Sequence, residues 1–164
     1  MTTTKHNTPH TVEIATTFDV PAWLELAGQV EHLFGPMVHE PEFRNALDRA
    51  IDEKRAFCVR DGITDTSSHL LGGVIISTKR NAIGWFAVDQ VVRGCGIGTA
   101  LLSHSLKQLD GSADITVQTF ARNVSGGIPA HRLYERFGFC ERESAGLNQA
   151  GVETVIMLRP GDVI

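Results

Sequence analysis

Apolar side chains recur along this chain at two spacings, which predict both helices and strands. Val20–Phe34 and Pro41–Lys54 carry apolar residues three and four positions apart, the spacing of one helix face. Thr99–Leu109 repeats that spacing, and Pro129–Phe137 begins at a residue suited to a first helical turn and ends before a glycine. Short apolar or alternating runs bounded by turn residues predict strands at Thr11–Thr17, Ala56–Arg60, Leu70–Ser77, Gly84–Val88, Ile115–Phe120, Phe139–Glu143 and Val152–Leu158.

The order of these elements predicts an α/β fold with a mixed central β-sheet flanked by helices. Short turns join antiparallel strands, whereas helical crossovers join parallel ones, and this chain has both kinds of connection. The last two strands form a closing hairpin with its tip at Gly146–Gly151. With 164 residues and 42% hydrophobic content, residues 11–164 are expected to form a single domain that follows a flexible polar tail at residues 1–10.

Composition argues against several classes of function. A formal net charge of −4 and the lack of a basic run argue against nucleic acid as a partner. No apolar stretch approaches the length that spans a bilayer, so we expect no membrane association and a cytoplasmic protein. The three cysteines and seven histidines show no spacing typical of metal ligands, so no metal site is predicted.

Candidate chemistry is concentrated in the turn Arg93-Gly94-Cys95-Gly96-Ile97-Gly98, which follows a strand and opens a helix. Glycines let the backbone approach a ligand, and the first amides of a helix have no partner within it. Such a turn favours anions, and the guanidinium of Arg93 suits phosphate oxygens. The spacing does not match a P-loop, which needs a Lys after its last Gly, nor the dinucleotide fingerprint, whose third Gly would fall at Thr99.

Two motifs together resemble the Gcn5-related N-acetyltransferase (GNAT) family. Arg93-x-x-Gly96-x-Gly98 is similar to the family signature R-x-x-G-x-G/A, and Leu133-Tyr-Glu-x-x-Gly-Phe139 is similar to its later helix motif. The motifs stand in the family's order, about 40 residues apart, and the strands and helices also follow that order. The resemblance covers nearly the whole chain and implies a GNAT-like fold.

The resemblance also implies how acetyl-coenzyme A (acetyl-CoA) is held. In the family the glycine loop binds the pyrophosphate, and the fourth strand pairs with the pantetheine arm. The coenzyme-binding residues implied here are Phe86, Ala87, Val88, Arg93, Gly94, Cys95, Gly96, Ile97, Gly98, Thr99 and Asn123. For Asn123 the chain departs from the pattern, because the family's Asn lies about seven residues before its tyrosine, where this chain has Gly127.

The resemblance implies that Tyr134 is the general acid that protonates the departing thiolate. Many relatives take a general base from the fourth strand, which here offers only Asp89 at its exit. Glu31 is the leading candidate base, because a carboxylate on an apolar helix stripe is costly without a partner or a role. The alternative is that Glu31 flanks the stripe and reaches solvent. The other candidates are a water chain or one of the side chains of His32, His39, Glu40 and His131.

The function implied is direct transfer of acetyl from acetyl-CoA to an amine in a ternary complex, without metal. The acceptor is a small molecule or a peptide, and Trp23, Phe34 and residues 35–41 are expected on its side of the site. With Glu31 or Glu40, that side would suit a cationic amine. The alternative function is a non-catalytic module that binds acyl-CoA as a sensor. An exposed closing hairpin would also allow two copies to pair as a homodimer.

Overall fold

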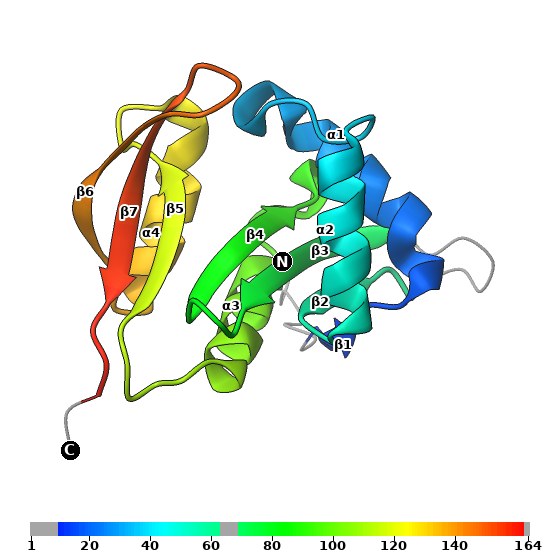
Figure 1. The fold of residues 1–164 in the computed structure, drawn as a ribbon, viewed down its shortest axis with the longest axis horizontal. Coiled ribbons are helices and arrows are strands. Elements are labelled where there is room, and N and C mark those ends of the chain that lie inside the picture. The colour runs from blue at the N-terminus through cyan, green and yellow to red at the C-terminus, as the bar shows by residue number, and fades with distance from the viewer. Residues whose placement is uncertain (1–9, 63–68, 163–164) are drawn as a thin grey trace, which may run out of the picture.

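A seven-stranded mixed sheet runs through the centre of the computed structural model, which describes residues 10–62 and 69–162. The strand order is β1-β2-β3-β4-β5-β7-β6 (Figure 1). Every neighbouring pair is antiparallel except β4 and β5, which are parallel. The strands are β1 (Glu13–Ile14), β2 (Ala56–Arg60), β3 (Leu70–Ser77), β4 (Ala82–Val88), β5 (Ile115–Phe120), β6 (Cys140–Leu147) and β7 (Glu153–Arg159).

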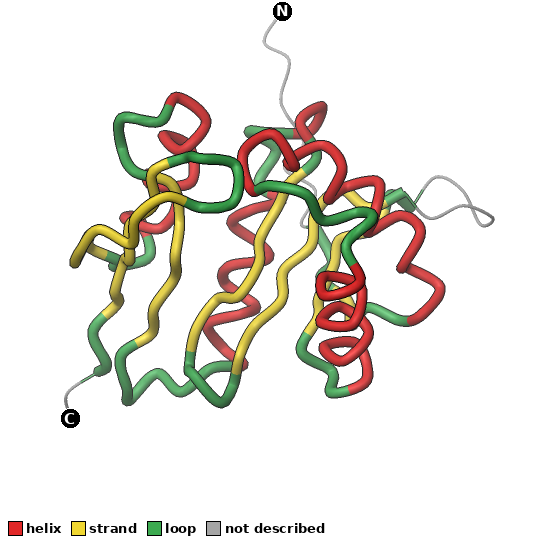
Figure 2. Tube along the Cα trace, turned by 45° about the horizontal axis from the view of Figure 1, so that its top comes forward, coloured by secondary structure: helices red, strands yellow, loops and turns green. Residues whose placement is uncertain are grey.

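Within the described residues, four α-helices cover the two faces of this sheet, as Figures 1 and 2 show. They are α1 (Val20–Phe34), α2 (Pro41–Asp52), α3 (Ile97–Gln108) and α4 (Ile128–Arg136). Alternate residues of β2 point to opposite faces, so Cys58 packs with α1 and α2 while Phe57 and Val59 pack with α3 and α4. None of these helices is long and apolar enough to span a bilayer, in the part of the chain that the structure describes.

The predicted α/β fold is confirmed, and the differences lie at element ends. The first strand was predicted over Thr11–Thr17, but β1 covers only Glu13–Ile14. The chain turns there because the Asp19 carboxylate accepts a hydrogen bond from the Thr16 amide at 2.7 Å, and a 3₁₀ turn follows at Thr17–Asp19. Of the predicted tail, residues 1–9 lie outside the described residues, while His10 Nε2 lies 2.7 Å from the Cys95 carbonyl oxygen.

Strands β4 and β5 pair over only two residues each, Ala82 with Thr116 and Ile83 with Val117, and then separate. Antiparallel pairing sends the N–H and C=O groups of alternate residues to the same side. The Asp89 amide donates to the Leu71 carbonyl of the β3 side, so the backbone groups of Phe86 and Val88 face away from β3, into the opening. The sheet is therefore split at its centre, and one unpaired edge of β4 borders the split.

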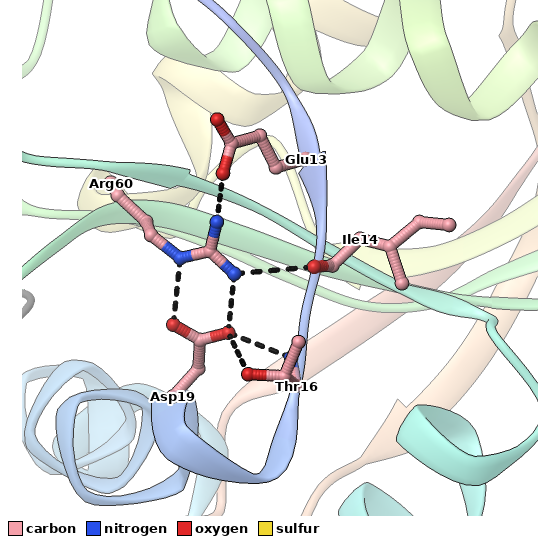
Figure 3. Close-up of polar contacts among 5 residues, drawn as sticks. All are labelled: Glu13, Ile14, Thr16, Asp19 and Arg60. Atoms are coloured by element: carbon pink, nitrogen blue, oxygen red, sulfur yellow. Dashed lines mark hydrogen bonds and ion pairs between the residues drawn. The ribbon is translucent and has the colours of Figure 1, made fainter.

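Arg60 fixes the start of α1 to the sheet (Figure 3). Its guanidinium donates two hydrogen bonds to the Asp19 carboxylate, Nε to Oδ1 at 2.9 Å and Nη2 to Oδ2 at 2.7 Å. It also donates to the Ile14 carbonyl oxygen at 3.2 Å and pairs with Glu13. Asp19 is only 1% exposed, so its charge depends on this bidentate partner. The network thereby sets where α1 begins over the sheet.

We expect Arg60→Met to lower the free energy of unfolding by about 3 kcal/mol, because it leaves the buried Asp19 carboxylate without its cation. Urea denaturation measures the change, with an unchanged slope showing that the unfolding transition is the same. Arg44→Met is the control, since it breaks an exposed pair with Asp48 that is worth about 0.5 kcal/mol. Equal losses for the two variants would contradict this account of the network.

Candidate functional site

A cleft of about 1040 Å³ opens where β4 and β5 separate, and it joins the two faces of the sheet. Its walls come from the end of α1, from β4, from the glycine turn, from the end of β5 and from α4. Nine of the eleven residues expected to bind coenzyme line it: Phe86, Ala87, Val88, Arg93, Gly94, Gly96, Ile97, Gly98 and Thr99. The fold thus brings the predicted loop and strand to one cavity.

The glycine turn presents backbone N–H groups to this cleft. Gly94 and Gly96 have φ angles of 80° and 87°, a region that favours glycine, and Gly96 is the N-cap of α3. The first bond within the helix runs from the Ala100 amide to the Gly96 carbonyl, so the amides of Ile97, Gly98 and Thr99 have no partner within α3. A Cβ at Gly98 would lie 3.1 Å from Leu133 Cδ2, so glycine also lets α4 pack closely.

Three arginines give the cleft wall a positive charge. Arg93 lies on the glycine turn, and Arg132 and Arg136 lie four residues apart on α4. None of the three forms an ion pair with a described residue, whereas Glu135, also in the wall, is paired with Arg122. Unpaired guanidinium groups beside open helix amides favour a ligand with several phosphate oxygens.

Tyr134 lies behind the cleft wall, with 3% of its surface exposed. Its ring meets the Phe86 ring edge-on, with centroids 6.2 Å apart, and the Phe139 ring, with centroids 5.5 Å apart. Burial raises the pKa of the Tyr134 phenol, so the hydroxyl stays protonated at neutral pH. A phenol that stays protonated cannot serve as a base at neutral pH, and Tyr134 contacts the cleft-lining ring of Phe86 without lining the cleft itself.

Besides Tyr134, three of the predicted site residues do not line the cleft. The Glu31 carboxylate accepts a hydrogen bond from the Val38 amide at 2.9 Å, so it shapes the turn after α1. Asn123 Nδ2 donates to Glu153 Oε2 at 3.2 Å. Cys95 is exposed and is not among the residues that line the cleft.

Asp89 at the exit of β4 is buried and already has its partners. It accepts hydrogen bonds from the Val91 amide at 2.9 Å and from Gln29 at 3.1 Å, and His69 Nε2 lies 2.7 Å away. Burial alone would raise the pKa of this carboxyl, but these hydrogen bonds outweigh it and lower the pKa. Asp89 therefore holds the turn before the glycine loop as a carboxylate.

His131 has a role that sequence reasoning did not find. It is 2% exposed, and its Nε2 lies 2.6 Å from the Phe120 carbonyl oxygen, so Nε2–H donates to that carbonyl. Phe120 is the last residue of β5, on the edge that β4 has left. His131 thus satisfies a backbone group at the split. The other candidate bases, His32, His39 and Glu40, are exposed and do not line the cleft.

Residues 53–141, more than half of the chain, match the family profile of the acetyltransferase (GNAT) domain. The chain belongs to the GNAT family. It is therefore an N-acetyltransferase with acetyl-CoA as acetyl donor, and the described residues contain no cluster able to hold a metal ion. No curated protein matches the chain.

Solved structures share this fold over nearly the whole chain. The ribosomal-protein-S18-alanine N-acetyltransferase from Escherichia coli is 25% identical, with 94% of this chain and 96% of that chain covered and a TM-score of 0.65. The NatC complex bound to Gag peptide and CoA is 16% identical, with 94% and 100% covered and a TM-score of 0.72. Ard1 from Thermoplasma volcanium is 17% identical, with 95% and 100% covered and a TM-score of 0.70.

We expect the double substitution Arg132→Gln and Arg136→Gln to raise the Kd for acetyl-CoA about tenfold, because each exposed charge pair with a phosphate contributes about 0.5–1 kcal/mol. Calorimetric titration measures the Kd, and the difference from wild type should shrink as salt is added. Arg142→Gln on the exposed strand β6 is the matched control and should bind like wild type. A wild-type Kd in the double variant would show that Arg132 and Arg136 do not contact the coenzyme phosphates.

Proposed function

We propose that this chain transfers acetyl directly from acetyl-CoA to the α-amine of a peptide or protein. The observation that carries the proposal is the apolar wall of the cleft on the α1 face of the sheet. Val30, Leu33 and Phe34 of α1 meet Phe120 and Gly126 there. The Phe34 and Phe120 rings are in contact, with centroids 5.0 Å apart.

We assign the acetyl donor to one face of the cleft and the amine acceptor to the other. The glycine turn and α4, with the unpaired arginines, lie on the α3 and α4 face, so we place the coenzyme phosphates there. The amine then approaches from the α1 face. In the family, acetyl-CoA supplies an activated acetyl group as a thioester. The backbone groups of Phe86 and Val88 that face the opening can hold the pantetheine arm and polarise the acetyl carbonyl.

The charge of the acceptor side disfavours polycationic amines. Of the described residues lining the cleft, Glu135 is the one carboxylate, and it lies on α4 paired with Arg122. Glu31, expected to attract a cation, is bonded to the Val38 amide instead. A polyamine or aminoglycoside would therefore bring several positive charges to an apolar wall with no partner for them.

An α-amine fits a site without a strong side-chain base. Its pKa in peptides is about 7.7–8.0, so a large fraction is neutral at cellular pH, whereas a lysine amine has a pKa of about 10.4. The likeness to the ribosomal-protein-S18-alanine enzyme, at 25% identity, supports the same class of acceptor. Direct transfer is supported by the cysteines, since none of the three lines the cleft to accept the acetyl group.

A free peptide α-amine should be the better acceptor in a direct comparison. We expect kcat/KM for a short peptide with a free N-terminus to exceed that for spermidine, or for a lysine-containing peptide with a blocked N-terminus, at least about tenfold at pH 7.5, following the amine pKa values. The rate for the free peptide should rise with pH and level off above about pH 8. Release of coenzyme A measures the rate with each of the three acceptors. Faster acetylation of the blocked peptide or of spermidine would contradict the proposal.

Tyr134→Phe tests the acid that the proposed transfer requires. The ring and its contacts with Phe86 and Phe139 remain, so acetyl-CoA affinity and thermal stability should stay close to wild type. The maximal rate should fall at least about 100-fold, the usual contribution of a positioned acid. An unchanged rate would exclude Tyr134 as the acid. Wild-type protein that binds acetyl-CoA but releases no coenzyme A with any amine would instead be a binding module.

A further inference from the structure

Asn148 connects the hairpin tip between β6 and β7 to the last turn of α1, across 115 positions of sequence. Its Nδ2 donates to the Leu33 carbonyl oxygen at 2.7 Å. Its Oδ1 accepts from the amides of Ala150 at 2.9 Å and Val152 at 3.1 Å, which folds the tip. Because a carbonyl faces one end of the amide and two N–H groups face the other, only one orientation of the side chain fits.

The Leu33 carbonyl is one of the helix-end groups that have no partner within α1, so Asn148 acts as its cap from another part of the chain. The Leu33 side chain lines the cleft and packs on the loop after β5, where a Cβ on Gly126 would lie 3.0 Å from Leu33 Cδ1. Next to it, a Cβ on Gly35 would lie 2.7 Å from Gln149 Cβ. The end of α1 and the hairpin tip are therefore in direct contact beside the cleft, at the top of Figure 1.

This contact joins the two parts of the molecule that the split separates. Helix α1 packs on β2, β3 and β4, whereas the hairpin belongs to β5, β6 and β7. The paired residues of β4 and β5 hold one end of the split closed. Asn148 holds α1 to the hairpin where the strands have separated, on the face that we assign to the acceptor.

We propose that Asn148 is a positioning residue that sets the width of the acceptor entrance, by fixing Leu33 over the cleft. This rests on the proposed function for the identity of the acceptor side. With the entrance held narrow, a small first side chain of a peptide is accepted more readily than a large one. Releasing the contact should widen the range of acceptors and leave the coenzyme face, on the other side of the sheet, unchanged.

The substitution Asn148→Asp separates the two duties of this side chain. A carboxylate still accepts from Ala150 and Val152, so the tip keeps its turn, but it cannot donate to the Leu33 carbonyl. Asn45→Asp is the matched control, because it makes the same chemical change on the exposed face of α2. Asn148→Ala removes both the donated and the accepted hydrogen bonds. Its difference from Asn148→Asp shows the additional effect of losing the turn.

The readout is the ratio of kcat/KM for Phe-Ala-Ala amide to that for Ala-Ala-Ala amide, with acetyl-CoA hydrolysis without amine as a second measure. We expect Asn148→Asp to raise the ratio about five- to tenfold and to speed hydrolysis, the effect of one lost hydrogen bond on an opening equilibrium. Its Kd for acetyl-CoA should stay within about twofold of wild type, as expected for independent sites. Asn45→Asp should change none of these.

Two results would overturn the inference. One is an unchanged peptide ratio together with unchanged hydrolysis in Asn148→Asp, and the other is a lower melting temperature as the sole effect. If wild type acetylates neither peptide, the inference is tested by the rates of acetyl-CoA hydrolysis in wild type and Asn148→Asp, and equal rates reject it. If wild type does not bind acetyl-CoA, the proposed function has failed. In that case hydrogen exchange tests the contact between Asn148 and α1 on its own. The probe is the Gly35 amide, which donates to the Glu31 carbonyl oxygen at the end of α1, and equal protection of this amide in wild type and Asn148→Asp rejects the contact.

Discussion

The separation of β4 from β5 after two paired residues is the constraint on which the rest of the structure depends. A parallel pair within a sheet normally satisfies its backbone groups along the full strand length. Here the carbonyl of Phe120 takes its hydrogen bond from His131, and the facing groups of β4 remain open to the cleft. The glycine turn, the open backbone groups of β4 and the apolar wall from α1 all lie along this opening.

A sheet split in this way needs other contacts to stay in one piece. On the α3 and α4 face a single apolar cluster runs beneath both parts, with Phe57 and Val74 from one side and Val155 and Met157 from the other. On the opposite face the apolar cluster stops with β4 and belongs to α1 and α2. The coenzyme face is therefore backed by a continuous core, whereas the acceptor face is held across the split by contacts between loops and helix ends.

Sequence periodicity was enough for most of the fold, because the four helices and the strands β2, β3, β4, β5 and β7 bury residues whose spacing can be read directly, whereas β1 and β6 are exposed. The glycine turn was also readable, since few residue types fit φ angles such as those of Gly94 and Gly96. The hydrogen-bond partners of single polar side chains could not be predicted from the sequence. Glu31 lies beside an apolar stripe as predicted, yet its carboxylate meets the Val38 amide, and Asn148 reaches Leu33 across 115 positions. Such contacts depend on how distant segments pack, which periodicity does not encode.

The open groups of Phe86 and Val88 also mean that this sheet has unpaired strand edge in its interior as well as at its rim. Unpaired edges attract other polypeptides, and proteins commonly guard them with charge, proline or short strands. Here the unpaired edge is protected because helices cover it: α1 lies over one side of the opening, and α3 and α4 lie over the other. The helices that enclose the opening on both faces therefore also keep this edge from pairing with strands of other molecules.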